Sequence, residues 1–258
     1  MHAHFVLAHP EPMSFNAHLV RSGAAALVAA GWTASVTDLY AMGFDPCERG
    51  DFYTDRAAPD RFDAQAEQRH AHTTQTMPKV VMDELSLLDR ADLLVLQYPM
   101  WWHLPPAMLK GWFDRVFAVG EVYTSQKRFE KGRFVGKRAM LSVTVGTSRN
   151  TYAYDGRSGD IDLMLWPVNF SLAYAGYDVL VPFVAYGVEA GIRYSDPETV
   201  EARLKSNVDM FCAELPNVSR RANVPFNRMD EWGPDGRIVP AAPVYSPFVR
   251  RKEKLDLG

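Results

Sequence analysis

Residues 92–117 read DLLVLQYPMWWHLPPAMLKGWFDRVF, and this stretch decides the fold. Its first six residues form a short aliphatic run, which is typical of a strand buried on both faces of a parallel sheet. A loop rich in proline and aromatic residues follows over 98–106. From Met108 onward, apolar residues recur at the spacing of one helix face, at positions 108, 109, 112, 113, 116 and 117. The stretch therefore predicts one strand-loop-helix unit of an α/β protein.

The same alternation of short apolar runs and helical patterns extends over most of the chain. Right-handed crossovers leave few orders open to five parallel strands, and 2-1-3-4-5 is the common one at this size. The predicted fold is therefore α/β, a doubly wound five-stranded parallel sheet of order 2-1-3-4-5 with helices on both faces. The predicted strands cover 4–8, 33–39, 92–97, 138–145 and 178–185, and the predicted helices cover 16–30, 79–90, a stretch after 106, 160–175 and 195–212.

Two segments lie outside this alternating pattern. The first is a polar insertion, 45–78, and the second is a Pro-rich C-terminal extension, 213–258, with little periodicity. The remainder, 1–212, is expected to form one α/β domain. The insertion contains His70 and His72, but no cysteine or carboxylate group completes a metal site with them. We therefore predict a solvated loop there and no metal.

The composition excludes several classes of protein. The chain has 258 residues, with 28 Lys and Arg against 31 Asp and Glu, so it lacks the basic excess of a nucleic-acid binder. Its two cysteines, Cys47 and Cys212, are far apart, which indicates a reducing compartment. No apolar run reaches the ~18 residues of a spanning helix, and no signal-peptide pattern is visible. We expect a cytoplasmic protein without a membrane span.

In an open α/β sheet, ligands bind outside the carboxyl ends of the strands, where the strand order reverses. This rule selects three loops, 9–16, 98–106 and 145–159. The first, HPEPMSFN, has neither the dinucleotide motif G-x-G-x-x-G nor a P-loop. Ser14 and Asn16 stand beside a helix N-terminus, whose N–H groups can bind a phosphate. The alternative is that one of them is simply the N-cap.

The other two loops carry aromatic and small residues. Trp101 and Trp102 lie between prolines, with Tyr98 and His103 beside them, at a spacing that suits neither a strand nor a helix. Such an aromatic surface suits a flat conjugated ligand or, alternatively, an interface between proteins. The loop 145–159 combines small residues, which let backbone N–H groups approach a ligand, with tyrosines that can donate a proton. A flexible surface loop would look much the same.

Five segments carry a resemblance to a known family: FVLAHPEPMSFN, DLYAMGFDP, LQYPMWWHLPPAMLKGWFDRVF, SVTVGTSRNTY and GDIDLMLWPV. In this order, over residues 3–212, they closely resemble the NAD(P)H:quinone oxidoreductases of the DT-diaphorase type. The resemblance implies a flavodoxin-like fold, a tightly bound flavin (FAD, with FMN as the alternative), and a homodimer with active sites at the subunit interface. It also implies two-electron transfer of a hydride from NAD(P)H to flavin N5 and then to a quinone, in a ping-pong mechanism.

The resemblance assigns roles position by position. Tyr152, Ser158 and Gly146 take the catalytic positions. Tyr123 matches a tyrosine that the partner subunit lends to the pocket, and Arg203 matches an arginine near the adenine end of FAD. The substrate-pocket set is Trp102, His103, Tyr123, Ser125 and Tyr154. The cofactor-binding set is His9, Ser14, Phe15, Asn16, Ala17, Pro99, Met100, Trp101, Trp102, His103, Thr144, Val145, Gly146, Thr147, Tyr152 and Arg203.

The chain departs from the family pattern in the pocket. Ser158 stands where well-known members often have a histidine that partners the active-site tyrosine. Serine cannot become a cation, so stabilisation of the reduced flavin would depend mainly on Tyr152 and backbone N–H groups. His103 stands where an aromatic residue is usual, and Ser125 stands where the family has a second pocket tyrosine. These departures leave the choice of substrate open.

Three other functions stay open. The same reduced flavin could serve azo, nitro or metal acceptors. Some short members of the superfamily dock as regulatory subunits on potassium-efflux transporters, and the extension 213–258 could then be the docking segment. The third is a flavin-binding electron carrier, against which the aromatic loop argues because it resembles one shaped for a hydride donor. NAD(P)H-dependent quinone reduction by the isolated protein separates the enzyme from the last two.

Overall fold

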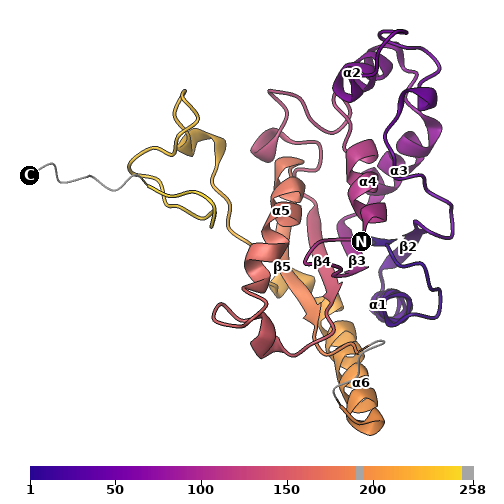
Figure 1. Cartoon of the computed structure of the whole chain (residues 1–258), viewed down its shortest axis with the longest axis vertical. Coiled ribbons are helices and arrows are strands. Elements are labelled where there is room, and N and C mark those ends of the chain that lie inside the picture. The colour runs from indigo at the N-terminus through magenta and orange to yellow at the C-terminus, as the bar shows by residue number, and fades with distance from the viewer. Residues whose placement is uncertain (190–194, 252–258) are drawn as a thin grey trace, which may run out of the picture.

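The computed structural model describes residues 1–189 and 195–251, and its centre is one parallel sheet (Figure 1). The strand order is β2-β1-β3-β4-β5, and every neighbouring pair is parallel. The strands are β1 (His2–Leu7), β2 (Thr33–Asp38), β3 (Leu93–Pro99), β4 (Arg138–Thr144) and β5 (Asp178–Ala185). The predicted doubly wound α/β sheet of order 2-1-3-4-5 is confirmed.

Helices cover both faces of the sheet and divide the core into two. On one face lie α1 (Phe15–Ala29) and α6 (Pro197–Glu214), and on the other lie α3 (Lys79–Arg90), α4 (Ala107–Val116) and α5 (Ile161–Tyr174). Every residue of β3 is buried, and its side chains enter the two cores alternately. β3 is therefore the central strand that its aliphatic pattern predicts.

Local sequence sets both ends of α1. The Ser14 hydroxyl oxygen accepts a hydrogen bond from the Ala17 N–H at 3.2 Å, so Ser14 is the N-cap. Past the C-terminal end, Gly31 adopts a φ of 84°, and the Gly31 and Trp32 N–H groups donate to carbonyls of the last turn. The start of α1 is thereby fixed at the carboxyl edge of the sheet.

The polar insertion 45–78 holds a helix that the sequence pattern did not reveal, α2 (Ala64–Thr74). The helix has no broad apolar stripe, and polar side chains fasten it to the rest of the molecule. Gln68 is buried, donates to the Asp114 carbonyl at 3.1 Å and accepts from the Val119 N–H at 3.0 Å. Hydrogen bonds therefore replace the hydrophobic periodicity on which the prediction relied.

The prediction of a solvated loop around His70 and His72 is wrong, because both residues lie on α2. The Nε2 atom of His70 lies 2.9 Å from an Asp55 carboxylate oxygen, and Nδ1 of His72 lies 2.9 Å from Glu121. Residues two apart on a helix face different directions, so each histidine binds a different segment. The first pair closes the insertion on itself, and the second ties it to the chain after α4.

The C-terminal region covers the open edge of β5. The segment 222–224 runs antiparallel along this strand: the Val181 N–H donates to the Ala222 carbonyl at 2.9 Å, and the Val224 N–H donates to the Val179 carbonyl at 2.8 Å. An uncovered sheet edge invites pairing with other chains, and this segment blocks it. Farther on, the chain stands away from the sheet (Figure 1). Within residues 1–189 and 195–251, no helix has the length and apolar character needed to cross a bilayer.

Candidate active site

Three loops meet at the carboxyl edge of the sheet. They follow β1, β3 and β4, which are neighbours in the strand order, so the loops 9–16, 98–106 and 145–159 lie side by side. Strand order reverses between β1 and β3, and open α/β sheets bind ligands at such a switch point. The structure brings together the segments that the sequence selected.

The loop after β1 ends at a helix N-terminus with unused donors. Ser14 caps the helix, as weighed from the sequence, and the N–H groups of Phe15 and Asn16 have no acceptor within the helix. On the other side of the loop, Nδ1 of His9 accepts a hydrogen bond from the Glu11 N–H at 3.0 Å. Burial lowers the pKa of His9, which favours the neutral imidazole that can accept this bond. The loop can therefore receive an anion at the helix end.

The loop after β3 contains a strained two-residue turn. The Trp101 and Leu104 N–H groups each donate to the other residue's carbonyl at 3.0 Å, and between them Trp102 and His103 have φ angles of 53° and 64°. Two consecutive left-handed residues in such a turn are normally Asn and Gly. The Trp102 side chain is 92% exposed, and the Trp101 ring lies 6.0 Å from the His9 ring. Backbone strain of this kind is concentrated at functional sites.

The loop after β4 offers an unused hydroxyl and an open backbone. Thr147 Oγ1 is buried and has no partner among the described residues. Gly146 is exposed, and a side-chain carbon placed there would meet no atom closer than 3.8 Å. The Ser158 N–H donates to the Thr151 carbonyl at 3.0 Å, which brings Ser158 against the turn that carries Tyr152. A ligand can therefore approach both the Thr147 hydroxyl and the backbone.

The proposed catalytic tyrosine lies in an aromatic cluster beside a cation. Tyr152 ends a short turn, η3 (Arg149–Tyr152), and its ring lies 6.4 Å from that of Tyr186. The Arg149 guanidinium lies 5.5 Å from the Tyr186 ring centre. Burial raises the pKa of Tyr186, and Arg149 opposes that rise. Tyr154, farther along the same loop, is 84% exposed.

Two residues assigned to the flavin by resemblance, Asn16 and Thr144, turn their side chains into the core. Both are buried, and Asn16 Nδ2 donates to Thr144 Oγ1 at 3.1 Å. Gln97 of β3 completes this cluster by donating from Nε2 to Asn16 Oδ1 at 2.8 Å. Sequence reasoning missed Gln97, and the available signal was a polar amide at the end of an otherwise aliphatic buried strand.

Arg203 lies beside the third loop. It lines a cavity of about 680 Å³ together with Gly146 and Thr147. Its guanidinium donates to the Gly187 carbonyl at 3.2 Å and to the Glu189 carboxylate at 3.1 Å. The cavity has the size of a small-molecule site, and Arg203 brings a cation to it.

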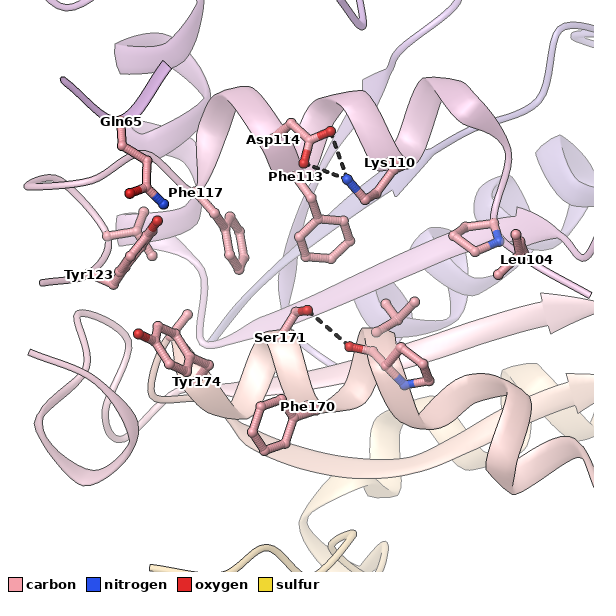
Figure 2. Close-up of a pocket in the computed structure, with 15 residues that line it drawn as sticks. Gln65, Leu104, Lys110, Phe113, Asp114, Phe117, Tyr123, Phe170, Ser171 and Tyr174 are labelled. Carbon is pink, nitrogen blue, oxygen red and sulfur yellow. Dashed lines mark hydrogen bonds and ion pairs between the residues drawn. The ribbon is translucent and has the colours of Figure 1, made fainter. Parts of the chain in front are cut away.

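An apolar groove runs between α4 and α5 (Figure 2). It encloses about 540 Å³, with Leu104 at one end and with Tyr123 and Tyr174 at the other, their rings 5.4 Å apart. The two ends of the groove are separated by helix α4, which has 10 residues and is therefore about 15 Å long. Within one chain, the structure therefore separates Tyr123 from Trp102 and His103.

The groups at the carboxyl edge fit a flavin. Free N–H groups at the start of α1 suit a phosphate, and the exposed tryptophan surface suits a flat ring. The Thr147 hydroxyl supports the same fit, because it is a buried polar group that the described chain leaves without a partner. Buried polar groups are nearly always hydrogen-bonded, so this one calls for a polar ligand or a water molecule.

Known proteins share this architecture. Residues 1–208 match a family model described as a flavodoxin-like fold. NAD(P)H dehydrogenase (quinone) 1 of Cavia porcellus is 39% identical over 185 residues, which are 71% of this chain and 67% of that protein. Ribosyldihydronicotinamide dehydrogenase (quinone) of Mus musculus is 36% identical over 186 residues, which are 71% of this chain and 80% of that protein.

A solved structure from Klebsiella pneumoniae, described as that of a candidate quinone reductase, resembles the chain over nearly its whole length. The TM-score is 0.84 at 30% sequence identity, and the match covers 93% of this chain and 94% of that one. The fold, the loops where the strand order reverses and the named relatives all indicate the same family. The chain belongs to the NAD(P)H:quinone oxidoreductase family of flavodoxin-like proteins.

Proposed function

We propose that this chain is an FAD-dependent NAD(P)H:quinone oxidoreductase that transfers two electrons as a hydride. The names of its relatives give the reaction class. The observation that carries the proposal is the strained turn at Trp102 and His103, which holds an exposed aromatic side chain at the switch point of the sheet. Neither core packing nor helix capping accounts for that strain, whereas a site for a flat ligand does.

When bound, a flavin would supply the redox chemistry, as a hydride acceptor at N5 for NAD(P)H and a hydride donor to the quinone, with one pocket serving both substrates in a ping-pong sequence. The chain would bind and orient the reactants. The Phe15 and Asn16 N–H groups would hold a phosphate, and Trp101 and Trp102 would line a flat ring and exclude water.

In this proposal, the loop 145–159 stabilises negative charge on the flavin and supplies a proton. The Gly146 N–H and the Thr147 hydroxyl would donate hydrogen bonds to the flavin where negative charge develops on reduction. Tyr152 would donate a proton or a hydrogen bond to the same part of the flavin. Ser158 lies against the Tyr152 turn and adds a neutral hydroxyl where the family often has a histidine. Proton supply at this site then depends on Tyr152.

Arg203 supports FAD over FMN. It lies in the large cavity next to Gly146 and Thr147, where a dinucleotide extending from the flavin ring can reach it. Its guanidinium already binds Gly187 and Glu189, and an arginine has five N–H donors, so it can add a contact to a nucleotide. FMN, which lacks the adenylate, would leave this cavity without a role.

The substrate pocket is proposed to form between two copies of the chain. Tyr123 and Ser125 belong to the pocket by resemblance, yet Tyr123 lies at the end of the groove away from the aromatic turn. A two-fold axis across the groove would place the Tyr123 end of one copy beside the Leu104 end of the other. We therefore propose a homodimer whose pocket combines Trp102, His103 and Tyr154 of one chain with Tyr123 and Ser125 of its partner.

The proposal also covers the domain organisation of the chain and its location in the cell. Residues 1–212 act as the catalytic domain. Of the extension 213–258, the part up to residue 224 packs on the same chain, with Leu215 and Val218 in the core and 222–224 along β5, so the part after 224 is the one proposed to pack on the dimer. We place the protein in the cytoplasm, in keeping with its two unpaired cysteines, Cys47 and Cys212.

Steady-state kinetics test the proposal. The isolated protein should oxidise NADH or NADPH continuously only when a quinone is present, beyond the single equivalent that reduces the bound flavin. Double-reciprocal plots at several quinone concentrations should be parallel, as ping-pong kinetics requires. A flavin-loaded protein that oxidises neither nucleotide would instead be an electron carrier or a regulatory subunit.

Azo and nitro compounds form the second class of candidate acceptor. His103 and Ser125 replace two aromatic residues of the family pocket, which reduces the stacking surface available to a quinone. Measuring kcat/KM for a quinone, an azo dye and a nitroarene in one assay decides between the classes. The proposal expects the quinone to have the highest value.

A further inference from the structure

A buried polar cluster lies directly beneath the candidate site. We define the amide triad as Asn16, Gln97 and Thr144, which are 3%, 0% and 4% exposed. Gln97 Nε2 donates to Asn16 Oδ1 at 2.8 Å, and Asn16 Nδ2 donates to Thr144 Oγ1 at 3.1 Å. Away from water, each of these hydrogen bonds is strong, and the loss of a partner is costly.

Each member of the triad lies close to the point where a different loop of the site begins or ends. Asn16 lies in the first turn of α1, at the end of the loop after β1. Gln97 lies in β3, two residues before the strand ends and leads into the aromatic turn. Thr144 is the last residue of β4 and stands two residues before Gly146. The triad therefore connects all three loops of the site through their side chains.

We propose that Gln97 is a positioning residue of the flavin site. By donating to Asn16, it sets the first turn of α1 against the loops after β3 and β4. The Phe15 and Asn16 N–H groups then stand at a fixed separation from the aromatic turn and from Gly146. This inference rests on the proposed function, because it needs a flavin that spans these loops. Gln97 is fully buried, so it acts through Asn16 and does not touch the ligand.

The chemistry of Gln97 favours positioning over simple packing. β3 is otherwise aliphatic, and an apolar residue of the same shape would fill the space without a hydrogen-bonding requirement. Gln97 Oε1 has no partner within the described part of the chain, so the bond donated to Asn16 is the side-chain hydrogen bond that the described residues give this amide. A buried hydrogen bond adds directional definition that apolar contact lacks. At metal sites, partners that orient the ligating residues typically change metal affinity by about 10- to 100-fold, and we take the lower end as the expected effect of Gln97 on flavin affinity.

Flavin affinity of the variant Gln97→Met tests the inference. Methionine matches the length of glutamine and removes the donor. The flavin is stripped from the protein, and the apo-protein is titrated with FAD to obtain Kd. We expect Kd to rise about tenfold. A wild-type Kd would overturn the inference.

A matched control separates positioning from stability. Ser142 pairs with Gln97 in the strand register, is equally buried and has a hydroxyl without a partner in the described residues. Ser142→Ala should leave the Kd for FAD unchanged, even if it lowers the unfolding temperature of the apo-protein as much as Gln97→Met does. Equal losses of affinity in both variants would mean that general loosening of the core is responsible, and would overturn the inference.

A double-mutant cycle tests whether Gln97 acts through Asn16. The Kd of Asn16→Ala combined with Gln97→Met should equal that of Asn16→Ala alone within about twofold, because the second change removes a bond already lost. Losses that multiply would contradict this route. If Gln97→Met does not fold, Asn16→Ala removes the acceptor of the same Gln97 hydrogen bond, and an unchanged Kd for FAD in that variant would again overturn the inference.

The experiments distinguish a failure of the proposed function from a failure of the role proposed for Gln97. Wild-type apo-protein that binds neither FAD nor FMN removes the proposed function. Wild-type protein that binds a flavin, together with a Gln97→Met variant of equal affinity, removes only the role of Gln97.

Discussion

The carboxyl edge of the sheet and the α4–α5 groove differ in how complete they are within one chain. At the edge, a capped helix, a strained turn and an open loop converge, and a buried triad connects them. In the groove, Phe113, Phe117 and Tyr123 are only partly buried and line an open apolar surface (Figure 2). Under the proposed function, cofactor binding belongs to one chain, whereas turnover needs two. Changes in the groove should therefore affect turnover and leave flavin binding intact.

The largest effect is expected from a charge in the groove. Ser171 lies on α5 inside it. In Ser171→Arg, an interface over the groove would have to bury a guanidinium, so we expect monomers in analytical ultracentrifugation and roughly 100-fold slower quinone reduction. The flavin content should stay at the wild-type level.

The matched control is Ser86→Arg, which adds the same charge on the exposed face of α3. It should remain a dimer with full activity. A Ser171→Arg protein that is monomeric and fully active would break the comparison, because the groove would then play no part in turnover.

The next effect concerns the edge. Tyr152→Phe removes the hydroxyl proposed to act on the flavin, and we expect flavin reduction by NADPH to slow about 100-fold in single-turnover stopped-flow measurements. Tyr40→Phe, on the turn after β2, serves as the control. Unchanged single-turnover rates would remove Tyr152 from the mechanism.

A smaller effect is expected where the chain departs from its family. Ser158→His introduces a group that is protonated below its ordinary pKa of about 6.5. Because the cation stabilises the reduced flavin, reduction should become several-fold faster, about 3- to 10-fold, as the pH falls through that value. The rate is measured between pH 5 and 8, with Ser158→Asn as the control that cannot titrate. Equal or lower activity with a flat profile would indicate that the pocket has been adapted to another use.

The smallest effect is one of stability. His103 has a left-handed φ of 64°, which glycine adopts without strain. His103→Gly should raise the free energy of unfolding of the apo-protein by about 1 kcal/mol in urea, and should slow quinone reduction because the turn loosens. His103→Ala keeps the strain and should bring no such gain. A destabilised glycine variant would show that the turn is not strained.

The sequence predicted the scaffold well, because hydrophobic periodicity reports burial directly. α3 (Lys79–Arg90) and β5 (Asp178–Ala185) have the predicted bounds. The sequence missed α2, whose contacts to the body are polar and leave no apolar stripe. Hydrophobic periodicity does not reveal a helix that is held to the rest of the molecule by hydrogen bonds.

The candidate site was predicted in part. The three loops could be found because strand order alone places them together. The left-handed pair Trp102 and His103 could not, since neither residue type signals positive φ, and Gln97 looked like part of a buried strand. The sequence did place Trp102 and Tyr123 on either side of a predicted helix, but it could not show that α4 and α5 line one groove between them, because that depends on packing.

A complete flavin site within one chain should be visible in the absorption spectrum of the purified protein. We expect the bands of an oxidised flavin, bleaching on addition of NADPH, and release of one FAD per chain on denaturation. A colourless protein that takes up neither FAD nor FMN would show that the chain carries no flavin site.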